Sequence, residues 1–459
     1  METTEAEAAA AKPAPASLIA KRTAILVVHG VGQQEKYQTV GDFAAGLVVR
    51  LKAATGKTFT PTRRLRKFSC GIESILRLTP DGATTDPACY IDIVEYFYQP
   101  ALQRKVALSD VVDWLIRTAD HIRALYRNNE ALRREISGAG VTATGGLGQN
   151  YMLYNFAVVV PILVWAVRLA RLLQKIPAIG EYLKWPAALI NWIIGHLLDD
   201  LIVNFAGDVT AYTAIDAKEK LHEVRGQVLG GCVTILKELL TGTGPGIEYD
   251  QVVLAGHSLG SVVTYDAASL ISAEAEADAD ALAPAALRKL VGYVTFGSPL
   301  DKVAMCFWPF EASAGDNGTD ARAGWVRQRS EIRQMMLEHF HGMRGLSPRL
   351  TGHPKAAGQR PLEHVIWMNF YHPKDIIAGS LDAYRGVTNI QTYADDGTPE
   401  YTASDQKFPG AHSYYWYDPH MHDTVISTFL TDDVSPCFDD RAKFSAKLAA
   451  LQARSKKDL

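Results

Sequence analysis

The stretch Gln251-Val252-Val253-Leu254-Ala255-Gly256-His257-Ser258-Leu259-Gly260 decides the fold class of this chain. Its first half is the apolar run of a buried strand, and the apolar residues from Ser261 to Ala268 favour a helix directly after it. Between them, Gly256 to Gly260 has the Gly-x-Ser-x-Gly pattern of a nucleophile elbow, in which a strained serine stands at the end of a strand. The stretch therefore predicts an α/β protein with a doubly wound, mostly parallel sheet and a nucleophilic Ser258. The alternative is an ordinary glycine-rich turn.

A second glycine loop lies near the start of the chain. The apolar run Ala24–Val28 predicts a buried strand that continues into the loop His29–Gly32. In α/β-hydrolases such a loop supplies one backbone N–H to the oxyanion hole, and the residue after the serine supplies another. We therefore expect the amides of Val31 (less favourably Gly32) and Leu259 to hold the oxyanion. The residues expected to border the substrate are His29, Gly30, Gly32 and His257.

A serine nucleophile also needs an acid and a base, which follow it in the order aspartate then histidine. Two further strand-like runs, Leu290–Phe296 and His364–Tyr371, each end near an aspartate. Open α/β sheets place their sites at the carboxyl ends of strands. We prefer Asp375, because it follows the later run and leaves room for a histidine still further along the chain. Asp301 is the alternative, and Asp382 is a more distant one.

His412 is the expected base. It lies in the glycine-containing segment Pro409–Trp416, after the last strand signal and before the expected C-terminal helix. His420 and His422 are alternatives, but a spacing of two residues does not put two imidazoles on one helix face and so does not favour a metal site. With the serine and the preferred aspartate, His412 completes a triad order that requires no metal or organic cofactor.

Six segments in a fixed order add a family resemblance. They are Val28–Gln34, Gly207–Tyr212, Gly256–Asp266 (GHSLGSVVTYD), Gly297–Pro299, Asn369–Asp375 and His412–Trp416. Together they resemble the intracellular phospholipase A1 group that carries a DDHD domain. The resemblance implies an α/β-hydrolase fold, the triad Ser258, Asp375 and His412, and an acyl ester of a glycerophospholipid as substrate. The chain departs from the group at Ile376, where the group has proline, and at 385–389, where an aspartate of the group is missing.

Composition and length bound the remaining possibilities. A chain of 459 residues with 47% hydrophobic content can bury a large core. Its net charge of −3 argues against nucleic acid as a main partner, and its five scattered cysteines favour reduced thiols. The first 20 residues lack a signal-peptide pattern, so we expect a disordered tail and a cytoplasmic protein. The expected organisation is a tail (1–20), an α/β-hydrolase core (21–100 and 206–440), a helical cap (101–205), a second insertion (304–360) and a C-terminal helix or tail (441–459).

The expected cap contains an apolar hairpin over residues 154–205. Its two apolar runs, 156–167 and 185–198, are each shorter than the roughly 20 residues that cross a bilayer. Tryptophan residues in these runs, with arginine and lysine nearby, suit a membrane–water interface. We expect the hairpin to cap the active site and to contact a membrane surface. The alternatives are buried cap helices, a dimer interface, or a double membrane span.

These observations predict a serine esterase that cleaves acyl esters of lipids. A thioesterase or an acyltransferase would use the same triad with a different leaving group or acceptor. A peptidase is less favoured because of the apolar hairpin. A membrane-associated scaffold with an inactive hydrolase fold is the non-enzymatic alternative.

Overall fold

The computed structural model describes several separate ranges of the 459-residue chain. The described residues are 21–30, 35–82, 89–102, 212, 222–242, 248–278, 282–300, 361–372, 375, 377–381, 384, 386–392 and 410–431. The expected N-terminal tail, the cap apart from Ala101 and Leu102, the second insertion and the C-terminal segment 441–459 lie outside them.

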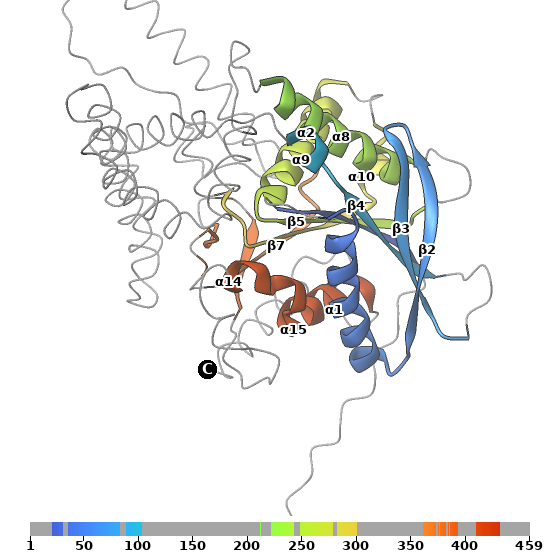
Figure 1. Cartoon of the computed structure of the whole chain (residues 1–459). Helices are drawn as coiled ribbons and strands as arrows, with labels where there is room; N and C mark the ends of the chain where they lie inside the picture. Colours follow the sequence, from blue (N-terminus) through green and yellow to red (C-terminus); the bar gives the residue numbers. More distant parts are fainter. Residues whose placement is uncertain are drawn as a thin grey trace, which may run out of the picture.

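An eight-stranded sheet organises the described residues (Figure 1). Its strands are β1 (Arg22–Val28), β2 (Phe59–Phe68), β3 (Gly71–Pro80), β4 (Tyr90–Tyr96), β5 (Gln251–His257), β6 (Leu290–Phe296), β7 (Ile366–Tyr371) and β8 (Val387–Gln391). They lie in the order β2-β3-β4-β1-β5-β6-β7-β8. Strands β4, β1, β5, β6, β7 and β8 run parallel, and the β2–β3 hairpin joins β4 antiparallel at one edge. The predicted α/β class with a mostly parallel sheet is confirmed.

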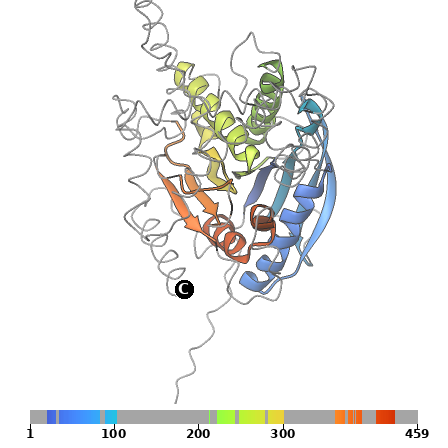
Figure 2. The ribbon, with the colours of Figure 1, turned by 60° about the vertical axis from the view of Figure 1, so that its left-hand side comes forward.

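Helices cover both faces of the sheet, which is why its central strands are continuous apolar runs. The helices are α1 (Gln38–Thr55), α2 (Gln99–Leu102), α8 (His222–Thr241), α9 (Leu259–Ala277), α10 (Pro284–Leu287), α14 (Gly410–Ser413) and α15 (Pro419–Val425). Helices α8, α9 and α10 lie on one face, and α1 and α15 on the other (Figures 1 and 2). Alternate residues of β1 follow this division, because Leu26 packs into the core under α8 and α9 while Ile25 and Val27 pack into the core under α1 and α15.

Strand pairing brings the two expected core segments into one sheet. Strand β1 pairs with β4 on one side and with β5 on the other, although β5 begins more than two hundred residues later. Because these strands are parallel, their carboxyl ends meet at one edge. In that edge Val28 is the partner of Gly256, and Phe296 is the partner of both His257 and Phe370. The loops after β1, β5, β6 and β7 therefore begin side by side.

Five predicted strands are confirmed with small shifts of their ends: β1, β5, β6, β7 and also β4, which the apolar run 89–98 predicts. The elements that were not predicted include the β2–β3 hairpin, the strand β8 and the long helices α1 and α8. In the described part of the chain no helix is both long enough and apolar enough to cross a membrane. The apolar runs 156–167 and 185–198 lie outside that part, so their contact with a membrane stays a prediction.

Candidate active site

Ser258 occupies a strained turn between β5 and α9. Its φ of 51° and ψ of −128° are rare for a residue with a side chain, and such a conformation costs about 1–3 kcal/mol. The strain persists because strand and helix approach each other closely on both sides of the serine. A Cβ at Gly256 would lie 2.6 Å from the Cα of Ser261, and one at Gly260 would collide with the carbonyl oxygens of Val28 and His29. The glycines of the motif are therefore required by packing.

The structure brings Ser258, His412 and Asp375 into one hydrogen-bonded chain. The Nε2 atom of His412 lies 2.9 Å from the Ser258 hydroxyl, and its Nδ1 lies 2.8 Å from an Asp375 carboxylate oxygen. A carboxylate only accepts, so Nδ1–H donates to Asp375 and Nε2 is left to accept the serine proton. The three side chains come from the β5–α9 turn, the segment after β7 and helix α14. The prediction that His412 lies in a loop was wrong, because it lies in the short helix α14, in which Ala411 and His412 are buried.

Asp375 is held as a carboxylate by the groups around it. One oxygen accepts a hydrogen bond from the Ile377 amide at 2.9 Å, and the other accepts from the Tyr415 hydroxyl at 2.9 Å and from His412. Burial alone would raise the pKa of the Asp375 carboxyl. The neighbouring His412 ring and these hydrogen bonds outweigh burial and lower the pKa to about 2. Asp375 is therefore charged at neutral pH and fixes the orientation of the imidazole.

Tyr415 belongs to the segment His412–Trp416 of the family resemblance, but its contact with Asp375 was not predicted. Its hydroxyl donates to Asp375 and accepts from the backbone amide of His372 at 2.8 Å. Tyr415→Phe should lower the free energy of unfolding by about 1–3 kcal/mol, because it removes one hydrogen bond to a backbone amide and one to a charged group. Urea unfolding measures this loss.

Tyr417→Phe provides the matched control for that measurement. Tyr417 lies two residues further along the chain and is 53% exposed, so losing its hydroxyl should cost little. Equal midpoints for the two variants would show that the Tyr415 hydroxyl does not stabilise the buried carboxylate.

The glycine loop after β1 passes directly over the serine. A Cβ at Gly30 would lie 2.6 Å from the Ser258 Cβ and 3.2 Å from its hydroxyl oxygen, so only glycine fits. Across the turn, Leu259 is the first residue of α9, and its backbone N–H has no acceptor within its own helix. Leu259 thus remains a candidate oxyanion donor. The other two expected donors, Val31 and Gly32, lie outside the described residues.

The fully buried ring of His29 holds the glycine loop, and its expected place beside the substrate stays a prediction. Its Nδ1–H donates to the Gly30 carbonyl at 2.6 Å, and its Nε2 accepts from the Tyr98 amide at 3.3 Å. The Tyr98 hydroxyl also lies 3.0 Å and 3.1 Å from the carbonyls of His29 and Gly30. The sequence does not indicate this role of Tyr98, because no local pattern reveals a contact across 69 residues.

Neither alternative histidine joins this arrangement. Asp301 and Asp382 lie outside the described residues. His420 is exposed, and the buried His422 donates from Nε2 to the Trp416 carbonyl at 2.8 Å. His257 is buried, and its Nε2 lies 2.9 Å from the backbone carbonyl oxygen of His412. Its expected place beside a substrate stays a prediction.

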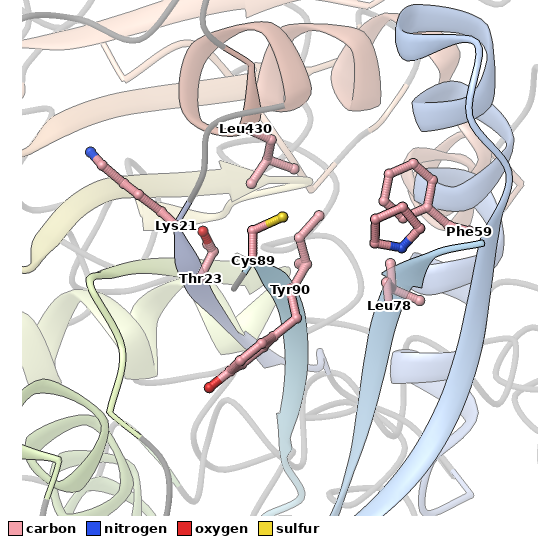
Figure 3. A pocket seen from close by; sticks show the side chains of 9 residues that line it. Lys21, Thr23, Phe59, Leu78, Cys89, Tyr90 and Leu430 are labelled. Atoms are coloured by element: carbon pink, nitrogen blue, oxygen red, sulfur yellow. The ribbon is translucent and has the colours of Figure 1, made fainter. Parts of the chain in front are cut away.

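A shallow, largely apolar hollow lies elsewhere on the molecule. It is bordered by Thr23, Phe59, Cys89 and Leu430, among others (Figure 3). Thr23 and Cys89 are at the amino-terminal ends of β1 and β4, whereas Ser258 follows the carboxyl end of the neighbouring β5. The hollow therefore lies at the end of the sheet where the parallel strands begin, away from the arrangement around the serine.

The buried histidines predict a loss of stability on acidification. Burial lowers the pKa of His29 to about 4, of His257 to about 3 and of His422 to about 4. Below the ordinary pKa of 6.5, the unfolded chain binds more protons at these positions than the folded chain does. The free energy of unfolding therefore decreases as the pH decreases. Glu95 acts in the opposite direction, because burial raises its pKa to about 7. Among the described residues three groups outweigh one, so stability should decrease as pH falls through this window.

Urea midpoints from about pH 7 to about pH 4.5 measure this decrease. Glu95→Gln removes the opposing group and should make the decline steeper. A wild-type midpoint that stays constant across the window would contradict the presence of three uncharged buried imidazoles.

The site was also compared with known proteins. No family model, no curated protein and no solved structure matches this chain.

Proposed function

We propose that this chain is an α/β-hydrolase that cleaves carboxylic acyl esters of lipids through Ser258, His412 and Asp375. The single observation that carries the proposal is the continuous hydrogen-bonded chain from the Ser258 hydroxyl through His412 to Asp375. A buried polar network with a purely structural role is the competing explanation. Such a network does not need its serine in a strained conformation, whereas a nucleophile elbow does.

In the proposed reaction, His412 accepts the Ser258 proton as the hydroxyl oxygen attacks the ester carbonyl carbon. The backbone amide of Leu259, with an amide of the loop after Gly30, stabilises the oxyanion of the tetrahedral intermediate. His412 then gives its proton to the leaving alcohol, and an acyl–serine ester remains. Water attacks this ester with His412 as base and releases the fatty acid. Asp375 stabilises the imidazolium that forms twice in the cycle.

A lipid substrate is supported by burial and by the sequence. Ser258 is fully buried, and Asp375 and His412 are each 3% exposed, so an ester reaches the serine only when covering residues move. Lipases need such a cover because their substrates leave an apolar phase. The apolar runs within 154–205 and the resemblance to the phospholipase A1 group support the same substrate class.

Active-site labelling combined with a panel of esters tests the proposal. Wild type and Ser258→Ala are treated with a fluorophosphonate probe, with and without liposomes, and assayed on short-chain esters, long-chain esters and phospholipids. Labelling at Ser258 with a preference for long acyl chains, both lost in the variant, is the expected result. Labelling with cleavage of only short soluble esters would retain the triad and reject the lipid substrate.

Two other results would redirect the proposal. Faster acyl transfer to an added alcohol than to water, or a preference for thioesters, would identify an acyltransferase or a thioesterase on the same triad. Absence of labelling under every condition would reject an enzymatic role and favour a non-catalytic scaffold.

A further inference from the structure

His257 is the residue directly before Ser258, and its ring contacts the backbone of His412. Its Nε2 lies 2.9 Å from the backbone carbonyl oxygen of His412. A carbonyl oxygen only accepts, so Nε2 of His257 carries the hydrogen and its Nδ1 carries a lone pair. The end of β5 is thereby tied both to the ring of His412, through Ser258, and to its backbone, through His257.

The His257 ring is enclosed on several sides. Its centroid lies 4.9 Å from that of His412, 4.8 Å from that of Trp416 and 5.3 Å from that of Phe296. Within the described residues its Nδ1 has no hydrogen-bond partner. Protonation would therefore place an unpaired donor and a charge in a buried position beside the catalytic imidazole, and burial together with His412 lowers the pKa of His257 to about 3. The ring is uncharged at neutral pH.

The helix that carries His412 is short. Helix α14 has four residues, Gly410–Ser413, and so short a helix has little stability of its own. The expected triad geometry therefore depends on contacts from outside the helix. The His257 hydrogen bond is such a contact, and it is made to the very residue whose ring reacts.

We infer that His257 is a positioning residue of the proposed reaction, which holds the His412 backbone so that the imidazole stays within hydrogen-bonding distance of Ser258. This inference rests on the proposed function. The uncharged state of the ring is part of the role, because a second positive charge beside His412 would oppose formation of the imidazolium.

The test compares His257→Leu with His257→Gln. A glutamine amide can donate from nearly the position of Nε2, whereas leucine cannot donate. His257→Leu should lower kcat and the rate of fluorophosphonate labelling by about tenfold to a hundredfold with little change in KM, because a misplaced base slows only the chemical step. His257→Gln should recover most of this loss. His420→Leu, a change at an exposed histidine, is the control and should behave as wild type.

Each contrary outcome bears on one claim. Equal losses in the leucine and glutamine variants, matching their losses in urea midpoint, would overturn the inference in favour of a packing role, as would a leucine variant with the wild-type labelling rate. Both results leave the proposed function intact if wild-type Ser258 is labelled. Imidazole nitrogen NMR gives a readout that does not need activity: the expected state of His257 is neutral with hydrogen on Nε2 at neutral pH. A charged ring, or hydrogen on Nδ1, would overturn the inference.

Discussion

Replacing Ser258 with alanine should lower kcat/KM for ester hydrolysis by about 10⁴- to 10⁶-fold, because the proposed reaction would lose its nucleophile and with it the covalent intermediate. His412 and Asp375 remain in place, so the folded state should persist with a urea midpoint close to that of the wild type.

Asp375→Asn should lower kcat by roughly 10⁴-fold, since a neutral amide no longer fixes the imidazole tautomer or stabilises its charge. Steady-state kinetics and urea unfolding of the same preparations measure both effects.

Ser69→Ala is the matched control for this experiment. Ser69 is exposed in the turn between β2 and β3, far along the chain from the motif, and its loss should leave both activity and midpoint unchanged. If Ser258→Ala keeps a substantial part of the wild-type activity while Ser69→Ala keeps all of it, another group carries the chemistry. The observed hydrogen-bonded chain would then be structural.

Gly260→Ala should produce the largest loss of stability among single glycine substitutions near the site. The new methyl group would be forced into the backbone carbonyls of Val28 and His29, and backbone cannot rotate away as a flexible side chain can. Overpacking of this kind costs about 1–3 kcal/mol, and sometimes more. Since α9 would have to move away from β1, Ser258 should also lose its position, and fluorophosphonate labelling should slow together with the decrease in urea midpoint.

Gly230→Ala is the opposite case in the same protein. Gly230 is an exposed residue within α8, and a Cβ there would meet nothing within 4 Å. Alanine lowers the conformational freedom of the unfolded chain and suits a helix, so the variant should be more stable by about 0.4–1 kcal/mol. If alanine destabilises the protein at position 260 and stabilises it at position 230, close backbone approach at the motif excludes a side chain at position 260. A general intolerance of the fold to alanine would not give this difference. A destabilised Gly230→Ala would contradict that reading.

The predicted losses of activity and of stability both depend on the turn that carries Ser258. Packing of α9 against β1 forces the serine into a positive φ, and the same packing brings Gly30 over its side chain. Stability and the candidate chemistry therefore depend on the same small contact. The strained residue is held by the surrounding sheet and helices, which contribute the compensating free energy through their buried apolar surface.

The sequence alone was sufficient for the parts of the protein whose signal is local. Strands β1, β5 and β6 are buried on both faces and so appear as unbroken apolar runs, and the Gly-x-Ser-x-Gly pattern marks the turn after β5. Strand β2 gave no such signal, because it lies at the sheet edge and its middle residues, including Leu65 at 70% exposure, face solvent. Strand β8 is also an edge strand and is mostly half-buried.

Only the tertiary structure decided which side chains meet. From the sequence, Asp375 could be preferred by chain order, but its contact with His412 depends on how the segment after β7 packs beside α14. The supporting contacts are more distant still: His257 reaches His412 across 155 residues, and Tyr98 reaches His29 across 69. Hydrogen bonds between residues so far apart leave no periodic pattern in a single chain, because they are set by the pairing of parallel strands and the packing of helices on them rather than by neighbours along the backbone.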